Sequence, residues 1–127
     1  MSETITPQIL FADITAKPGM GALFVRLIGP SIGQRETPII QQMVTFAITD
    51  MGAALKHLVL DMSSITYMNS MALGMCIDFR NRAAAVKGDV IITGMSAEML
   101  YLFQMVKFDR LFKVVKTTEE LSKAIGA

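Results

Sequence analysis

The chain has 127 residues, which suits one domain able to bury its own core. Apolar residues make up 52% of it and charged residues 18%, a balance that argues against a disordered protein. Its 12 basic and 11 acidic side chains give a net charge of +1, so no basic field marks a nucleic-acid-binding protein.

The first residues and the single cysteine indicate in which cellular compartment the protein is expected. With Cys76 alone, no intrachain disulfide can form, which is compatible with a reducing environment. The first residues, MSETITPQIL, lack the basic start and apolar run of a signal peptide. No apolar run approaches the ~20 residues of a membrane helix. We therefore expect a cytoplasmic protein without membrane insertion.

The first half of the chain predicts two strands and a helix. The β-rich runs QILFADIT and GALFVRLIG are joined by the turn-forming AKPGM, which favours an antiparallel pair. GPSIGQRE then forms a loop. Thr37 followed by Pro38 predicts a helix start in which the Thr37 hydroxyl caps the helix. Apolar residues recur at helical spacing from there to Met51.

The second half alternates strands and helices. HLVLDM, DVIITG and LFKVV read as strands, and Ser70 to Val86 reads as a helix. Ser96 can cap a third helix, and Thr117 with Glu120 forms a capping box for a fourth that ends near Gly126. The order β-β-α-β-α-β-α-β-α predicts a single α/β domain over residues 1–127, with a mixed, mostly parallel sheet and about four helices.

Groups that could support catalysis are scarce. His57, the only histidine, lies at a strand end, and no cluster of histidines and cysteines is available for a metal. No glycine pattern makes a phosphate-binding loop. Asp61 is expected to accept backbone N–H bonds from the following turn. We therefore predict neither an enzyme nor a cofactor nor a metal site.

The stretch YMNSMALGMC, residues 67 to 76, stands apart. Either Asn69 or Ser70 can cap the helix that follows. The helix N-terminus would also stabilise a phosphate on Ser70, because its free N–H groups and dipole favour negative charge. Ser70 could thus act as a switch, with phosphorylation placing about −1.5 to −2 charges in a binding surface.

Two methionines support a binding surface at this place. A helical wheel puts four side chains opposite the face of Leu73 and Ile77: Met71, Met75, Asp78 and Arg82. We therefore expect Met71 and Met75 to be exposed, as methionines are on adaptable binding surfaces. Packing under a neighbouring loop is the alternative. The patch could also close by self-association into a homodimer.

The chain resembles the STAS domain family, shared by anti-sigma factor antagonists and the cytoplasmic ends of sulphate transporters. The segments LVLDMSSITYMNSMALGM and GDVIITGMSAEMLYLFQMVKFDRLFKV carry the resemblance, together with the element order. It runs from LFVRLIG to the last helix. The resemblance implies a non-enzymatic binding module in which Ser70 matches the serine that an anti-sigma kinase phosphorylates. The implied partner is an anti-sigma factor and serine kinase of the histidine-kinase-like type.

The sequence departs from the family pattern around Ser70. Asn69 stands at the motif aspartate, Met71 at the second serine and Ala72 at the motif glycine, while Pro30 and Ser31 replace acidic loop positions. A permanently active antagonist, or a kinase of altered specificity, would fit these changes. The candidate partner-binding residues are Asn69, Ser70, Met71, Ala72, Met75, Asp78, Arg82 and Ser31. A constitutive STAS adaptor subunit, in a signalling scaffold or in a lipid or anion transport complex, is the alternative function.

Overall fold

A computed structural model describes residues 11–126. The strands are β1 (Ala12–Lys17), β2 (Ala22–Leu27), β3 (Ser31–Ile32), β4 (His57–Asp61), β5 (Tyr67–Met68), β6 (Asp89–Thr93) and β7 (Lys113–Val115). The α-helices are α1 (Thr37–Met51), α2 (Ser70–Ala85), α3 (Ala97–Met105) and α4 (Thr118–Ile125).

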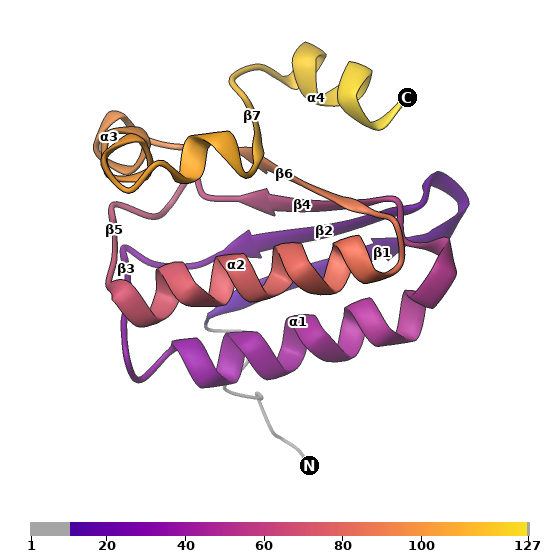
Figure 1. The fold of residues 1–127 in the computed structure, drawn as a ribbon, viewed down its shortest axis with the longest axis horizontal. Helices are drawn as coiled ribbons and strands as arrows, with labels where there is room; N and C mark the ends of the chain where they lie inside the picture. Colours follow the sequence, from indigo (N-terminus) through magenta and orange to yellow (C-terminus); the bar gives the residue numbers. More distant parts are fainter. Residues whose placement is uncertain (1–10, 127) are drawn as a thin grey trace.

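Five strands form one mixed sheet in the order β1-β2-β4-β6-β7. β1 runs antiparallel to β2, and the remaining neighbours pair in parallel. Figure 1 shows α1 and α2 side by side over one face of this sheet, with α4 on the other side. Within residues 11–126, the predicted α/β fold with an opening hairpin, a mostly parallel sheet and four α-helices is therefore confirmed.

Two further strands were not predicted. β3 and β5 pair in parallel as a separate two-stranded sheet, so the observed order has one extra strand before α1 and another before α2. The first strand also differs: the prediction covered residues 8–15, whereas β1 spans Ala12–Lys17. Residues 8–10 of that prediction lie outside the described residues.

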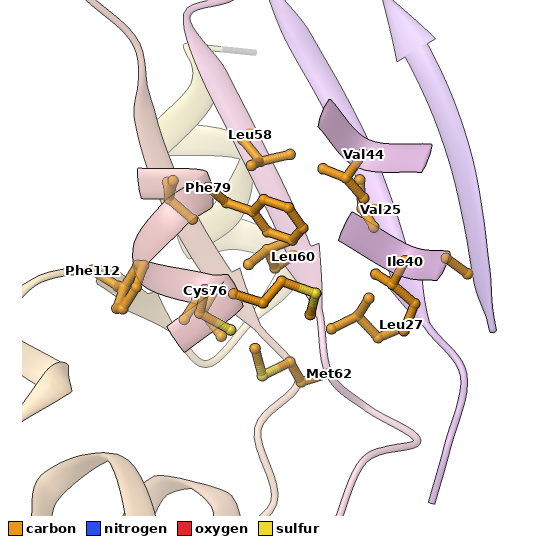
Figure 2. Close-up of a cluster of buried hydrophobic side chains, with 14 of the residues drawn as sticks. Val25, Leu27, Ile40, Val44, Leu58, Leu60, Met62, Cys76, Phe79 and Phe112 are labelled. Atoms are coloured by element: carbon orange, nitrogen blue, oxygen red, sulfur yellow. The ribbon is translucent and has the colours of Figure 1, made fainter. Parts of the chain in front are cut away.

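The core lies between the sheet and the two long helices. Alternate residues of the central strands point toward α1 and α2, as the period of two in a strand requires. Figure 2 shows Val25 and Leu27 of β2 and Leu60 of β4 against Val44 of α1 and Phe79 of α2. These side chains are fully buried. Burial of this apolar surface holds both helices to one face of the sheet.

Cys76 is part of this core, as predicted. Its side chain is fully buried, and burial raises the pKa of the thiol to about 12. The thiol therefore stays protonated and unreactive at neutral pH.

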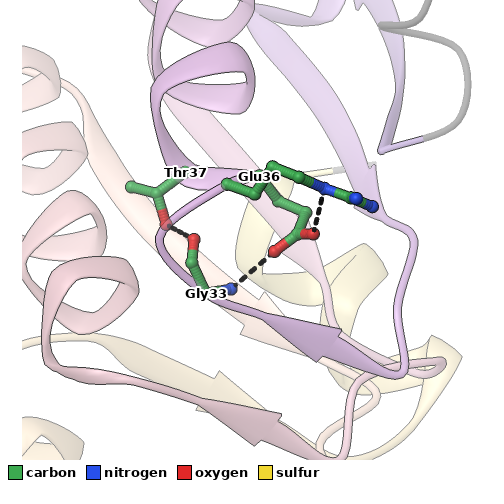
Figure 3. A network of polar contacts seen from close by, with 4 residues as sticks. Gly33, Glu36 and Thr37 are labelled. Carbon is green, nitrogen blue, oxygen red and sulfur yellow. Dashed lines mark hydrogen bonds and ion pairs between the residues drawn. The ribbon is translucent and has the colours of Figure 1, made fainter.

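The start of α1 differs from the prediction. Glu36, not Thr37, is the N-cap, and its carboxylate accepts the Gly33 N–H at 2.9 Å (Figure 3). Thr37 is buried, and its hydroxyl donates to the Gly33 carbonyl at 2.7 Å. A buried hydroxyl needs a partner of its own, and the preceding turn supplies this carbonyl. The bond from the Gly33 N–H is the main reason why the pKa of Glu36 lies below its usual range.

The other predicted caps are confirmed. The Ser96 hydroxyl accepts the Met99 N–H at 3.1 Å, and the Thr117 hydroxyl accepts the Glu120 N–H at 3.0 Å. The reciprocal arm of the capping box is displaced by one residue, because the Glu120 carboxylate binds the Lys116 N–H at 2.6 Å. Each cap satisfies a backbone donor that the first turn leaves unpaired.

Asp61 stabilises the turn after β4, as predicted. Its Oδ1 accepts the Ser63 N–H at 2.9 Å. Gly94, which follows the neighbouring strand β6, packs against this turn with a φ of +76°. A Cβ at Gly94 would lie 2.9 Å from Asp61 Oδ1 and 3.0 Å from the Ser63 backbone nitrogen. Glycine is therefore required there by both conformation and space.

Two glycine substitutions should change stability in opposite directions. Gly94→Ala should lower the free energy of unfolding by about 2 kcal/mol or more, because it combines a left-handed backbone with a clash. Gly74→Ala should raise it by up to ~1 kcal/mol, because Gly74 lies inside α2 and its Cβ would meet nothing within 4 Å. Urea unfolding measures both. Equal effects of the two substitutions on the free energy of unfolding would contradict the positive φ and the close contact found at Gly94.

Candidate functional site

The start of α2 separates a capping residue from an exposed serine. Asn69 is the N-cap: its backbone is extended, and its Oδ1 accepts the Ala72 N–H at 2.9 Å. Ser70 is the first residue of the helix and is exposed. Of the two caps that the sequence allowed, Asn69 is the one observed. The Ser70 hydroxyl is therefore not required to cap the helix.

The small β3–β5 sheet brings a distant loop to this helix start. Ser31 pairs with Tyr67, and Ile32 pairs with Met68. The Asn69 N–H donates to the Ile32 carbonyl at 3.2 Å, directly before α2 begins. Ser31, which the family resemblance matches to an acidic loop position, is thus held beside the start of α2 and is exposed. Its role in binding a partner stays a prediction.

The two methionines have different environments. Met71 is 45% exposed, as predicted, whereas Met75 is 2% exposed and belongs to the core. Ala72, another candidate contact residue, is fully buried. The prediction that Met75 and Ala72 lie on the binding surface is therefore wrong.

The orientation of α2 explains this error. The wheel centred the buried face on Leu73 and Ile77, but the most deeply buried stripe of α2 consists of Ala72, Cys76, Phe79 and Ala83. The side of α2 that carries Asp78 faces α1, because Gln41 of α1 donates to the Asp78 carboxylate. Met75 lies three residues before Asp78 on that side, and a wheel of α2 alone does not reveal that a neighbouring helix covers it.

An exposed aromatic residue lies three positions before the serine and was not singled out from the sequence. Tyr67 is 54% exposed, whereas its neighbour Met68 is fully covered. This alternation is the signature of a strand with one buried face, but two residues are too few to be recognised in a sequence. Tyr67, Ser70 and Met71, with Ser31 beside them, form what we call the α2-start surface.

Asp78 and Arg82 lie farther along α2. At ~1.5 Å per residue they are about 12 and 18 Å from Ser70 along the helix axis. The Asp78 carboxylate accepts hydrogen bonds from Arg82 Nε at 2.7 Å and from Gln41 Nε2 of α1 at 3.0 Å. Burial would raise the pKa of Asp78, but these two bonds and the Arg82 charge lower it overall. Asp78 thus links α2 to α1 through Gln41, and a role of Asp78 and Arg82 in partner binding stays a prediction.

The first turn of α2 contains no acidic side chain. Its unpaired N–H groups and the helix dipole therefore present positive potential near Ser70. Negative charge introduced on the Ser70 hydroxyl would be stabilised by the helix itself, while changing the charge of the surface that a partner would meet.

Three further features of residues 11–126 concern metal binding, the histidine and membrane insertion. No group of three or more histidine, cysteine, aspartate or glutamate side chains there could hold a metal ion. His57 Nδ1 lies 2.7 Å from Asp89 Oδ1, an ion pair or hydrogen bond that joins the beginnings of β4 and β6. In the same residues no helix is both long enough and apolar enough to span a bilayer.

Comparison with known proteins gives the same architecture. The model of the STAS domain matches residues 12–121. The phosphorylated form of SpoIIAA, a cell fate determinant of Bacillus, is 18% identical with a TM-score of 0.68, over 91% of this chain and 99% of that one. An anti-sigma-factor antagonist (STAS) domain protein of Planctomyces limnophilus is 14% identical with a TM-score of 0.78, over 90% and 96%.

A domain of a transporter has the same fold. The murine anion transporter Slc26a9 is 15% identical with a TM-score of 0.72, over 84% of this chain and 18% of the transporter. Identities this low establish a shared fold and leave the activity of each protein to its own residues.

Substitution of Met71 or Met75 by aspartate should have very different effects on the free energy of unfolding. Met75→Asp should lower the free energy of unfolding by about 3 kcal/mol or more, or prevent folding, because it buries a carboxylate in the core. Met71→Asp should change it by no more than ~0.5 kcal/mol, because the new charge is solvated and lies in the first turn of α2. Urea unfolding followed by circular dichroism measures both. A Met75→Asp protein as stable as wild type would contradict the observed rotation of α2.

Proposed function

The chain belongs to the STAS domain family, and from this we propose that it is a non-enzymatic regulatory module of the anti-sigma factor antagonist type. It binds its partner through the α2-start surface and is released when Ser70 is phosphorylated. The partner is an anti-sigma factor that is also a serine kinase of the histidine-kinase-like type.

The observation that carries this proposal is that Asn69, not Ser70, caps α2. Because Asn69 caps the helix, Ser70 is free to serve another purpose while staying exposed at the first helical position. Tyr67 and Met71 flank it with exposed apolar area, at 54% and 45% exposure. Aromatic and methionine side chains of this kind are enriched at protein interfaces.

Phosphorylation at this position would act through charge. The kinase would transfer the γ-phosphoryl group of ATP to the Ser70 hydroxyl, releasing ADP and the hydroxyl proton. The product carries about −1.5 to −2 charges, which the first turn of α2 stabilises in the free protein. In the complex the same charge would lie in an apolar contact, where its desolvation is unfavourable. Binding would therefore weaken without a change of fold.

A protein of the same fold supports this proposal. SpoIIAA, which has the same fold, is described as an anti-sigma factor antagonist and is known in unphosphorylated and phosphorylated forms. For this chain, that likeness supports an anti-sigma factor as the partner and a switch by phosphorylation, and we assign the switch to Ser70.

A constitutive STAS adaptor is a second candidate function, and two observations favour it. The position of the family's aspartate is Asn69, whose side chain is engaged in capping and carries no charge. The fold also occurs as part of the anion transporter Slc26a9. In this alternative the α2-start surface binds a scaffold or transport subunit permanently.

Ser70 variants distinguish the two functions. In pull-downs from the native organism, wild type and Ser70→Ala should capture a histidine-kinase-like protein, and Ser70→Asp should lose it, because the added charge opposes the apolar contact. Asn81→Asp is the matched control, since it adds the same charge at an exposed position of α2 about 17 Å farther along. Mass spectrometry identifies the captured proteins.

Two results of these pull-downs would contradict the proposed switch at Ser70. Capture of the same scaffold or transport subunits by wild type and Ser70→Asp would overturn the switch and favour the adaptor. If Asn81→Asp also lost its partner, added charge anywhere on α2 would weaken binding. The loss seen with Ser70→Asp would then not show that Ser70 is the switch.

A further inference from the structure

The helix α4 lies over a second, smaller group of buried side chains. It is placed on the face of the main sheet opposite α1 and α2 (Figure 1) and contacts β6. On that face Val59 of β4 and Ile91 of β6 are cross-strand neighbours, 1% and 0% exposed. Neither belongs to the core between the sheet and the two long helices. These two side chains therefore form a satellite cluster, and α4 is the helix that lies over it.

Half-buried apolar side chains hold α4 to the sheet. None of the residues of α4 is fully buried. Leu121, Ala124 and Ile125 share one side of the helix, and each is half-buried. Within the described part of the chain, the hydrogen bonds of α4 all join partners in residues 116–126, so none of them reaches β4 or β6. Partial apolar contact is therefore the main interaction that keeps α4 in place.

The packing around α4 is incomplete on two sides. A depression of about 160 Å³ lies beside Leu121, and Phe24 and Val59 line it from the sheet. A second depression, of about 330 Å³, is lined by residues of α4 and of β7. Side chains that border such gaps lack partner atoms on that side and lose part of their dispersion contacts. The contact between α4 and the sheet is therefore weaker than that of α1 and α2.

We propose that α4 is a cover that opens as a unit while the rest of the domain stays folded. Local opening of this kind occurs where buried apolar contacts are few. It exposes an apolar strip across three strands, because Phe24 pairs with Val59 and Val59 pairs with Ile91. Exposed apolar patches mark interaction sites, so the open form presents a surface that the closed form hides. The proposal is independent of the proposed function, because the α2-start surface does not include α4.

Two cysteine variants of one strand test the opening. Ile91 and Ile92 are neighbours in β6 and both are 0% exposed, but Ile92 belongs to the core under α1 and α2. In the purified full chain, Ile91→Cys should react with iodoacetamide about 100-fold or more faster than Ile92→Cys, because opening of α4 exposes only the first. The native Cys76 is buried in the core and reports global unfolding in both variants. Peptide mass spectrometry distinguishes the two cysteines.

Urea and a second substitution identify α4 as the part that opens. The reaction of Ile91→Cys should depend little on urea below the unfolding transition, because opening one helix exposes little surface, whereas that of Ile92→Cys should rise steeply. Adding Leu121→Ala to Ile91→Cys should speed the reaction by ~5-fold or more, because Leu121 is an apolar contact of α4. Lys123→Ala, at an exposed position of the same helix, is the matched control and should change the rate by less than ~2-fold.

Three results would overturn the proposal. The first is an equal rate and equal urea dependence for Ile91→Cys and Ile92→Cys, which would show that α4 opens only when the whole domain unfolds. The second is an Ile91→Cys rate that Leu121→Ala leaves unchanged, which would show that α4 is not the cover. The third comes from hydrogen exchange of the unmodified chain, where the amides of α4 should be less protected than those of β4: equal protection of the two would contradict separate opening.

Discussion

The rotation of α2 on the sheet is the constraint on which the arrangement of the molecule depends. Its stripe of Ala72, Cys76, Phe79 and Ala83 packs among the buried side chains of β2, β4 and β6. Small residues at three of these positions let the helix approach the sheet, and Phe79 fills the centre. With this stripe buried, Ser70 lies on the opposite side of the helix and is exposed, whereas Met75 lies next to the stripe and is covered. The geometry of the candidate site therefore follows from core packing.

The β3–β5 sheet supplies the second constraint. Two short strands with parallel pairing hold the chain before α1 against the chain before α2. The Asn69 backbone is thereby bonded to Ile32 at the point where its side chain caps α2. The segments that contain Ser31 and Tyr67 are both positioned by backbone hydrogen bonds. Side chains of the α2-start surface can therefore be substituted without moving the backbone that carries them.

The sequence predicted what depends on local patterns. Strand runs, helix caps at Ser96 and Thr117, the turn at Asp61 and the mostly parallel sheet each rest on spacing or on one residue's preference. The sequence did not predict the burial of Met75, because the buried face of an amphipathic helix depends on which neighbouring elements pack against it. Thr37 was misassigned for a related reason: its hydroxyl serves a buried turn, and burial is set by tertiary structure. Tyr67 and Ser31 became neighbours only through a long-range pairing.

The strand order carries a consequence for how the chain is assembled. The five strands of the main sheet lie side by side in the order in which they occur along the sequence. No strand has to insert between two that are already paired, so a chain emerging from the ribosome can extend its sheet at one edge, strand by strand, as each segment appears. The last addition, β7, is only three residues long, which leaves a short free edge at the end of synthesis and little template for pairing with other nascent chains.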